Sequence, residues 1–259
     1  MLNHLNRLYT QYNRREYVHP DPLEFLYLYD HREDREVAGL IASCLAYGKV
    51  RQILKSVSSV LDVMEPSPYS YLAETPEEEI KSTYQSFVHR FAKGYHLASL
   101  LLALKHVIKK YGSVYECFLD GFSNADENIL PALTQFIKKL RDSADGEGPG
   151  HLLASPENKS ACKRLNLFLR WMVRNDQVDP GGWKEIPASK LLVPLDIHMF
   201  RISRALGITS RNQANLLTAI EITENFKKWI PDDPVRFDFA LTRFGIRDDL
   251  NIDDIFGLC

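Results

Sequence analysis

The sequence predicts an all-α fold of two helical lobes packed together, with a groove between them. Apolar residues recur at helical spacing in nearly every segment; Val37, Ile41 and Cys44, for example, fall on one face of a predicted helix. No segment shows the sustained alternation of a strand, and no short internal repeat or low-complexity tract occurs. With 259 residues, the chain is long enough for one large or two small globular units.

Proline and glycine residues mark most of the predicted helix ends. Pro20 and Pro22 separate the first two helices, because proline breaks a helix interior. The third helix begins with acidic residues, which suit a helix N-terminus, and it ends at Gly48. Pro66 ends the fourth. The helices are expected at residues 4–16, 22–30, 33–47, 50–64, 69–73, 76–84, 97–111, 113–121, 127–143, 159–174, 211–229 and 233–244.

One segment divides the chain. Residues 144–158, ADGEGPGHLLASPEN, carry three glycines and two prolines and are expected to form a flexible loop. We expect a single domain whose lobes comprise about residues 33–143 and residues 1–32 plus 150–259.

The composition is that of an ordinary soluble protein, with 45% hydrophobic and 25% charged residues. The N-terminus has no apolar core for a signal peptide, and no run of about 18 apolar residues predicts a membrane span. Cys44, Cys117, Cys162 and Cys259 lie far apart, which excludes a four-cysteine zinc or iron–sulfur motif. We expect a cytoplasmic monomer without metal or other cofactor. The net charge of −2 still allows a local basic patch.

The most informative stretch is KLLVPLDIHMFRISRALG, residues 190–207, in which an apolar run delivers one carboxylate, Asp196. Pro194 cannot lie inside a helix, aspartate is a favoured N-cap, and Gly207 suits the position after a helix. Asp196 is therefore expected at the entrance of a short helix. It is either an N-cap alone or a carboxylate held rigidly for chemistry.

A second informative stretch is the predicted helix 159–174, which contains no acidic residue. Five of its polar residues fall within roughly an 80° sector. They are Lys159, Lys163, Asn166, Arg170 and Arg174. Cations four residues apart repel each other unless an anion neutralises them. The stripe is either a solvated polar face or, with Arg201 and Arg204 nearby in sequence, a surface for backbone phosphates.

Lys163 lies in the middle of this stripe and is the better candidate for a nucleophile. Neighbouring cations and burial both favour the neutral form of a lysine amine, which is the form that attacks. Lys159, nearer the helix start, is the second candidate.

The segment PLDIHMFRISRALG resembles the VDxHVxRVxxRLG segment of the helix-hairpin-helix DNA glycosylase superfamily, the group of endonuclease III and the 8-oxoguanine glycosylases. Asp196 falls at the position of that family's catalytic aspartate, and His198 and Arg201 also match. LIASCLAYGKVRQI at 40–53 resembles the helix that opens the glycosylase domain. FDFALTRFGI at 237–246 resembles the helix that closes it.

The chain departs from that family at the hairpin. The family's LPGVGxKTA binds DNA phosphate through glycine backbone, whereas the corresponding SPENKSACKRL here has no glycine, so an atypical hairpin is expected. Archaeal 8-oxoguanine glycosylases are similar in lacking the glycine hairpin while keeping a lysine on the helix. The iron–sulfur cysteines of endonuclease III are absent. The whole chain also resembles an uncharacterised bacterial family known only as a domain of unknown function, through KRLNLFLRWMVR and VDxGxW.

The resemblance implies a DNA base-excision repair N-glycosylase that acts on a flipped, damaged base in double-stranded DNA or on an abasic site. Asp196 would stabilise positive charge on the sugar, and Lys163 would attack the sugar carbon, which adds Schiff-base AP-lyase activity. If Lys163 does not attack, Asp196 would activate water instead.

The remaining predicted site residues follow from the same resemblance and from the basic stripe. The base pocket is expected to contain Tyr47, Gly48, Lys49 and Trp183, although core packing explains the two aromatics equally well. Nucleic acid is expected to contact Lys159, Arg170, Arg174, Arg201 and Arg204. Two alternatives stay open: a catalytically inactive DNA- or RNA-binding module on the same fold, and a helical protein scaffold in which Asp196 is only a cap.

Overall fold

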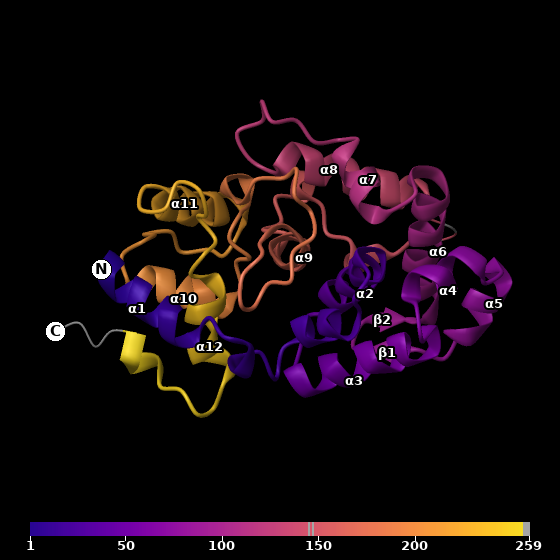
Figure 1. Cartoon of the computed structure of the whole chain (residues 1–259), viewed down its shortest axis with the longest axis horizontal. Helices are drawn as coiled ribbons and strands as arrows, with labels where there is room; N and C mark the ends of the chain where they lie inside the picture. Colours follow the sequence, from indigo (N-terminus) through magenta and orange to yellow (C-terminus); the bar gives the residue numbers. More distant parts are fainter. Residues whose placement is uncertain (145, 147, 256–259) are drawn as a thin grey trace. The chain divides into compact units, whose positions relative to one another are not determined.

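The computed structural model describes residues 1–144, 146 and 148–255, and Figure 1 traces the chain. Nearly all regular structure in these ranges is helical, so the predicted all-α fold is confirmed. Within the same ranges the only sheet is an antiparallel pair of two-residue strands, β1 (Val88–His89) and β2 (Ala92–Lys93). The sequence analysis did not predict this hairpin. None of the described helices is both long and apolar enough to cross a membrane.

The chain forms two compact units. The first consists of Met1–Pro20 and Lys159–Cys259, and the second of Asp21–Asn158. The first contains α1 (Leu2–Tyr12), η1 (Arg15–Tyr17), α9 (Lys163–Val173), η6 (Ala188–Lys190), α10 (Ile197–Ala205), α11 (Leu216–Lys227), α12 (Asp238–Ile246) and η7 (Ile252–Ile255). The second contains η2 (Pro22–Leu28), α2 (Arg32–Cys44), α3 (Val50–Leu61), η3 (Asp62–Met64), α4 (Pro68–Glu74), α5 (Glu77–Thr83), β1, β2, α6 (Gly94–Tyr111), α7 (Val114–Leu119), α8 (Leu130–Asp142), η4 (Gly150–Leu152) and η5 (Pro156–Asn158).

The boundaries of the units differ from the predicted lobes at two places. Residues 21–32 belong to the second unit because η2 packs against α2. The expected loop 144–158 also belongs there. It contains η4 and η5, and its Leu152 and Leu153 are fully buried. Residues 145 and 147 of that predicted loop lie outside the described residues.

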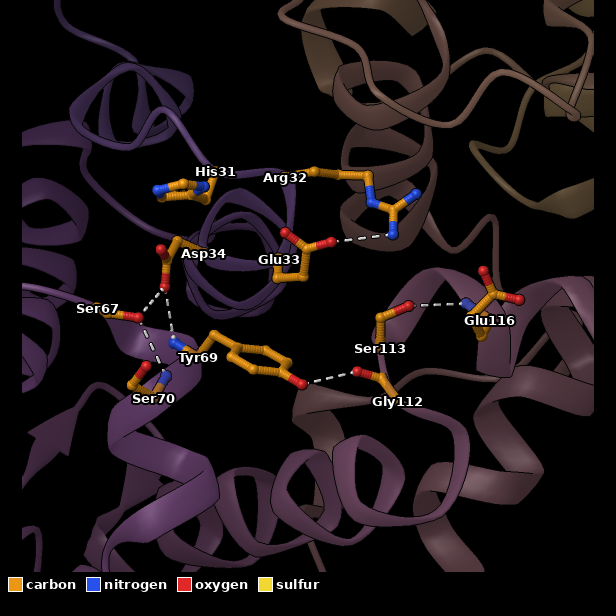
Figure 2. Close-up of a pocket in the computed structure, with 10 residues that line it drawn as sticks. All are labelled: His31, Arg32, Glu33, Asp34, Ser67, Tyr69, Ser70, Gly112, Ser113 and Glu116. Carbon is orange, nitrogen blue, oxygen red and sulfur yellow. Dashed lines mark hydrogen bonds and ion pairs between the residues drawn. The ribbon is translucent and has the colours of Figure 1, made fainter.

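The second unit is built around α6, which packs against α4, α5, α7 and α8. Its sequence is apolar on most sides, as expected for a helix surrounded by others. Two acids of α2 tie neighbouring helices to it. Asp34 Oδ1 accepts hydrogen bonds from Ser67 Oγ at 2.6 Å and Tyr69 N at 3.0 Å, as Figure 2 shows. Glu36 Oε2 accepts one from Tyr115 N at 3.1 Å. Asp34, Ser67 and Tyr69 are among the residues that line the pocket in Figure 2.

In the first unit, α9 is anchored by a buried ionic network at its C-terminal end. Arg170 donates from Nε to Asp179 Oδ1 at 3.2 Å and from Nη1 to Asp238 Oδ2. Arg174 donates from Nη1 to Asp179 Oδ2, and its Nε lies 3.0 Å from Asp233 Oδ2. The two arginine side chains are 2% and 4% exposed, so these pairs are shielded from water.

The network extends to α1 through Asp176. Its Oδ2 lies 2.8 Å from Arg174 Nη2 and also accepts hydrogen bonds from Tyr9 and Asn13, each at 3.0 Å. Burial opposes the charge on Arg174, but the surrounding aspartates outweigh it and raise the pKa of this guanidinium. Segments far apart in the sequence are thus joined through α9.

Replacing Arg170 with methionine should destabilise the protein by about 3–5 kcal/mol, because Asp238 would remain buried without its cation and Asp179 would keep only Arg174. Urea denaturation measures this loss as a change in the free energy of unfolding.

Arg201→Met is the matched control, since Arg201 is exposed on α10 and should change stability by no more than about 0.5 kcal/mol. If Arg170→Met lowers the free energy of unfolding by no more than this control does, the network does not anchor α9.

Candidate functional site

Asp196 caps α10, as the sequence predicts. Its Oδ1 accepts a hydrogen bond from Met199 N at 2.8 Å, and its backbone carbonyl accepts one from Phe200 N at 2.9 Å. The five residues before it, 191–195, are all buried and so fix the approach of the chain. Because the carboxylate is held from both sides, its orientation is set by the backbone.

The second carboxylate oxygen faces a lysine. Asp196 Oδ2 lies 3.7 Å from Lys163 Nζ, and the two side chains are 14% and 34% exposed. The structure thus brings together the two residues that the sequence analysis named as catalytic. One oxygen of Asp196 caps the helix, while the other remains available to a partner.

The start of α9 explains why Lys163 occupies this place. The helix was predicted from residue 159, but it begins at Lys163. Lys159 and Cys162 both adopt left-handed backbone conformations, with φ of 57° and 46°, which interrupt a helix. Asn166 then donates from Nδ2 to the carbonyl of Ala161 at 3.0 Å, which holds the turn against α9. Lys163 therefore occupies the first turn of α9, while Lys159 lies outside it and is exposed.

α10 and α12 approach each other closely beside this pair. A Cβ atom at Gly245 would lie 2.1 Å from His198 Nδ1, so only glycine lets the imidazole pack against α12 at this point. Asp238, the first residue of α12, is the partner of Arg170 in α9. Through α12, the ionic network therefore connects α9 with the helix that Asp196 caps.

The predicted phosphate-binding stripe is wrong for two of its arginines. Arg170 and Arg174 are 2% and 5% exposed, and their charges are neutralised by the protein's own aspartates. These aspartates come after α9 in the sequence. The absence of acids within the helix itself therefore did not mean that its cations bind an external anion. Asn166 of the same stripe is also buried. The predicted contacts that remain exposed are Lys159, Arg201 and Arg204.

Trp183 is not part of a base pocket. Its side chain is fully buried, and its ring packs edge-on against Phe168 at 5.2 Å between centroids. Its backbone N donates to Met172 O at 2.9 Å, which fixes the segment after α9. This tryptophan is a core residue.

The other three predicted base contacts lie in the second unit. Tyr47 is partly buried, and its hydroxyl donates to the His89 carbonyl at 2.9 Å. Gly48 adopts φ of 100°, and a Cβ atom there would lie 2.7 Å from Arg90 Cδ. Lys49 is exposed at the start of α3. Their role toward a base stays a prediction.

The sequence analysis missed Asp238, a fully buried acid coupled to the site. Burial, reinforced by the negative charge of Asp196, raises the pKa of Asp238 to about 6 although Arg170 opposes the shift. Its Oδ1 has no hydrogen-bond partner among the described residues and is the atom on which a proton would lie. The available signal was the set of aspartates that follow α9 in the sequence, since α9 carries arginine and no acid of its own. In the same described ranges, no group of His, Cys, Asp and Glu side chains is arranged to hold a metal ion.

Asp238→Asn should change how stability depends on pH. An unfolded aspartate ionises near pH 4, whereas native Asp238 keeps its proton to about pH 6. The contribution of Asp238 to stability is therefore full below about pH 4 and is lost as pH rises to 6, by at most about 3 kcal/mol. The wild-type free energy of unfolding minus that of the variant should fall across this window.

Denaturant titrations at pH 4, 5, 6 and 7 measure this difference, with asparagine as a neutral group of the same size. A difference that instead rises with pH would show that Arg170 keeps Asp238 ionised.

Comparison with known proteins places the chain in one family. The family model described as "Protein of unknown function (DUF2400)" matches residues 21–247. No curated protein and no solved structure matched the chain. The match extends over most of both units and includes Lys163, Asp196 and Asp238. The chain therefore belongs to the DUF2400 family.

Proposed function

We propose that this protein is a DNA N-glycosylase of the base-excision type with an associated Schiff-base lyase activity. The observation that carries the proposal is the 3.7 Å separation of Lys163 Nζ and Asp196 Oδ2. It supports the proposal because attack on a sugar carbon needs a nucleophilic amine and a nearby carboxylate that stabilises positive charge and accepts a proton.

In the proposed reaction, the neutral amine of Lys163 attacks C1′ of the target nucleotide. The N-glycosidic bond breaks, and its electron pair leaves with the base, which takes a proton from solvent. Asp196 stabilises the positive charge developing on the sugar and then accepts the proton lost by the attacking nitrogen. Opening of the sugar ring returns that proton to the ring oxygen and forms a protonated imine. Loss of a C2′ proton to solvent then expels the 3′ phosphate by β-elimination and cleaves the strand on the 3′ side.

The proposed substrate is a damaged base flipped out of double-stranded DNA, or an abasic site, bound by a cytoplasmic monomer. Exposed cations on the same unit support contact with phosphate, since Arg201 and Arg204 lie on the helix that Asp196 caps and Lys159 precedes α9. Should Lys163 not attack, Asp196 would activate water, and the enzyme would release the base without cutting the strand.

Borohydride trapping on labelled duplexes with an abasic site, uracil or 8-oxoguanine tests the proposal. Wild-type protein should form a covalent adduct, because borohydride reduces the imine to a stable amine. Lys163→Ala should form none, and Asp196→Asn should reduce the trapping rate by about 10²-fold or more.

Lys159→Ala is the matched control, since it removes a nearby exposed lysine outside the helix and should trap as wild type does. Asparagine keeps a capping oxygen at position 196, so Asp196→Asn should unfold at nearly the wild-type temperature. Base release without an adduct, dependent on Asp196, would identify the water mechanism. The glycosylase proposal fails if wild type gives neither adduct nor base release on these duplexes, and salt-dependent binding alone would then favour the inactive module.

A further inference from the structure

The β1–β2 hairpin of the second unit presents a surface that the chemistry of Lys163 and Asp196 does not use. Val88 pairs with Lys93 and His89 with Ala92, which leaves Arg90 and Phe91 in the turn. Arg90 adopts φ of 53°, a left-handed conformation that is uncommon for a residue with a side chain. Non-glycine residues in this conformation concentrate at functional sites.

Hydrogen bonds and packing against two helices hold the hairpin in place. His89 is fully buried, with Nδ1 lying 2.9 Å from Ser56 Oγ and Nε2 lying 3.1 Å from the Tyr47 carbonyl. Tyr47 in turn donates its hydroxyl to the His89 carbonyl. β1 also packs against α3, and β2 against α6 (Figure 1). Because the turn is already ordered, a ligand bound there would lose little affinity to ordering it.

A row of aromatic rings lies on this hairpin and beside it. Phe91 is 71% exposed and Tyr95 is 47% exposed, although large apolar side chains are usually buried. The Phe91 ring lies 6.4 Å from that of His151, which lies 5.7 Å from that of His96, and His96 lies 4.0 Å from Tyr95. The Arg90 guanidinium lies 5.5 Å from the Phe91 ring centroid.

The stretches that form the hairpin and the neighbouring helices α3 and α6 carry cations and no acid. No acidic residue occurs between Glu79 and Glu116, a stretch that contains the whole hairpin and α6. The neighbouring α3 and the residues before it likewise carry no acid from position 37 to position 61. The exposed cations that these stretches place at the hairpin are Lys49, Arg90 and Lys93. A protein partner's interface normally mixes both signs of charge, whereas cations beside exposed rings suit phosphates and bases.

We infer that this hairpin surface, defined as Lys49, Arg90, Phe91, Lys93, Tyr95 and His151, binds single-stranded nucleic acid by stacking unpaired bases on its rings. Cations at the edge of the surface contact the backbone phosphates. The bases must be unpaired, because the face of a base inside a duplex is covered by its neighbours. Gly48 contributes by leaving room for the Arg90 side chain.

The test is binding of the full chain to a fluorescein-labelled oligothymidylate of about 15 nucleotides, measured by fluorescence anisotropy at low salt. Phe91→Ala should weaken binding by at least about fivefold, as loss of a base-stacking ring does elsewhere. Phe91→Trp should bind at least as tightly as wild type, and Phe91→Leu should bind as weakly as the alanine variant.

Val88→Ala is the matched control, since Val88 is 64% exposed on the same hairpin but cannot stack, and it should leave affinity unchanged. Neither Lys163 nor Asp196 belongs to this surface, so the inference can survive failure of the proposed function. Wild-type affinity in Phe91→Leu, an equally large loss of affinity for the matching duplex in Phe91→Ala, or no binding by wild type to oligothymidylate and its RNA equivalent would each overturn the inference.

Discussion

The structure of the first unit depends on one buried constraint, the neutralisation of Arg170 and Arg174 by four aspartates. Burying two guanidinium groups is costly unless each finds carboxylates in good geometry, so the segments that supply those carboxylates must come together. They are the connection after α9, the segment before α12 and the first residue of α12 itself. The N-terminal end of α9 then carries Lys163 toward Asp196.

In the candidate site, the Asp196 side chain has a structural role and a proposed chemical role. Asp196 Oδ1 is committed to the N-cap, which fixes the carboxylate without a further partner. Oδ2 faces Lys163 and is partly open to solvent. Asp238 is a buried member of the ionic network whose pKa is raised in part by the charge of Asp196, and so it links the network to the site electrostatically. The buried structural cations and the candidate nucleophile thus lie at opposite ends of α9.

The sequence predicts the local features well because each depends on neighbouring residues. The apolar run, Pro194 and the following amphipathic segment are enough to place Asp196 at a helix entrance, and helical periodicity is enough for the fold class. Pairs between residues far apart in the sequence cannot be predicted from neighbouring residues. The burial of Arg170 depends on an aspartate 68 residues away. The late start of α9 depends on left-handed conformations at Lys159 and Cys162, which those residue types do not predict.

The chemistry proposed for this site requires Asp196 to stabilise positive charge at the sugar carbon of a bound nucleotide. The most direct measurement compares the affinities of two duplexes, one with a neutral tetrahydrofuran abasic analogue and one with a cationic pyrrolidine analogue that mimics the charged transition state. This role of Asp196 predicts that wild type binds the pyrrolidine duplex about 10²-fold more tightly or better, and that Asp196→Asn abolishes this preference. Equal affinity for the two duplexes, or a preference that persists in Asp196→Asn, would contradict it.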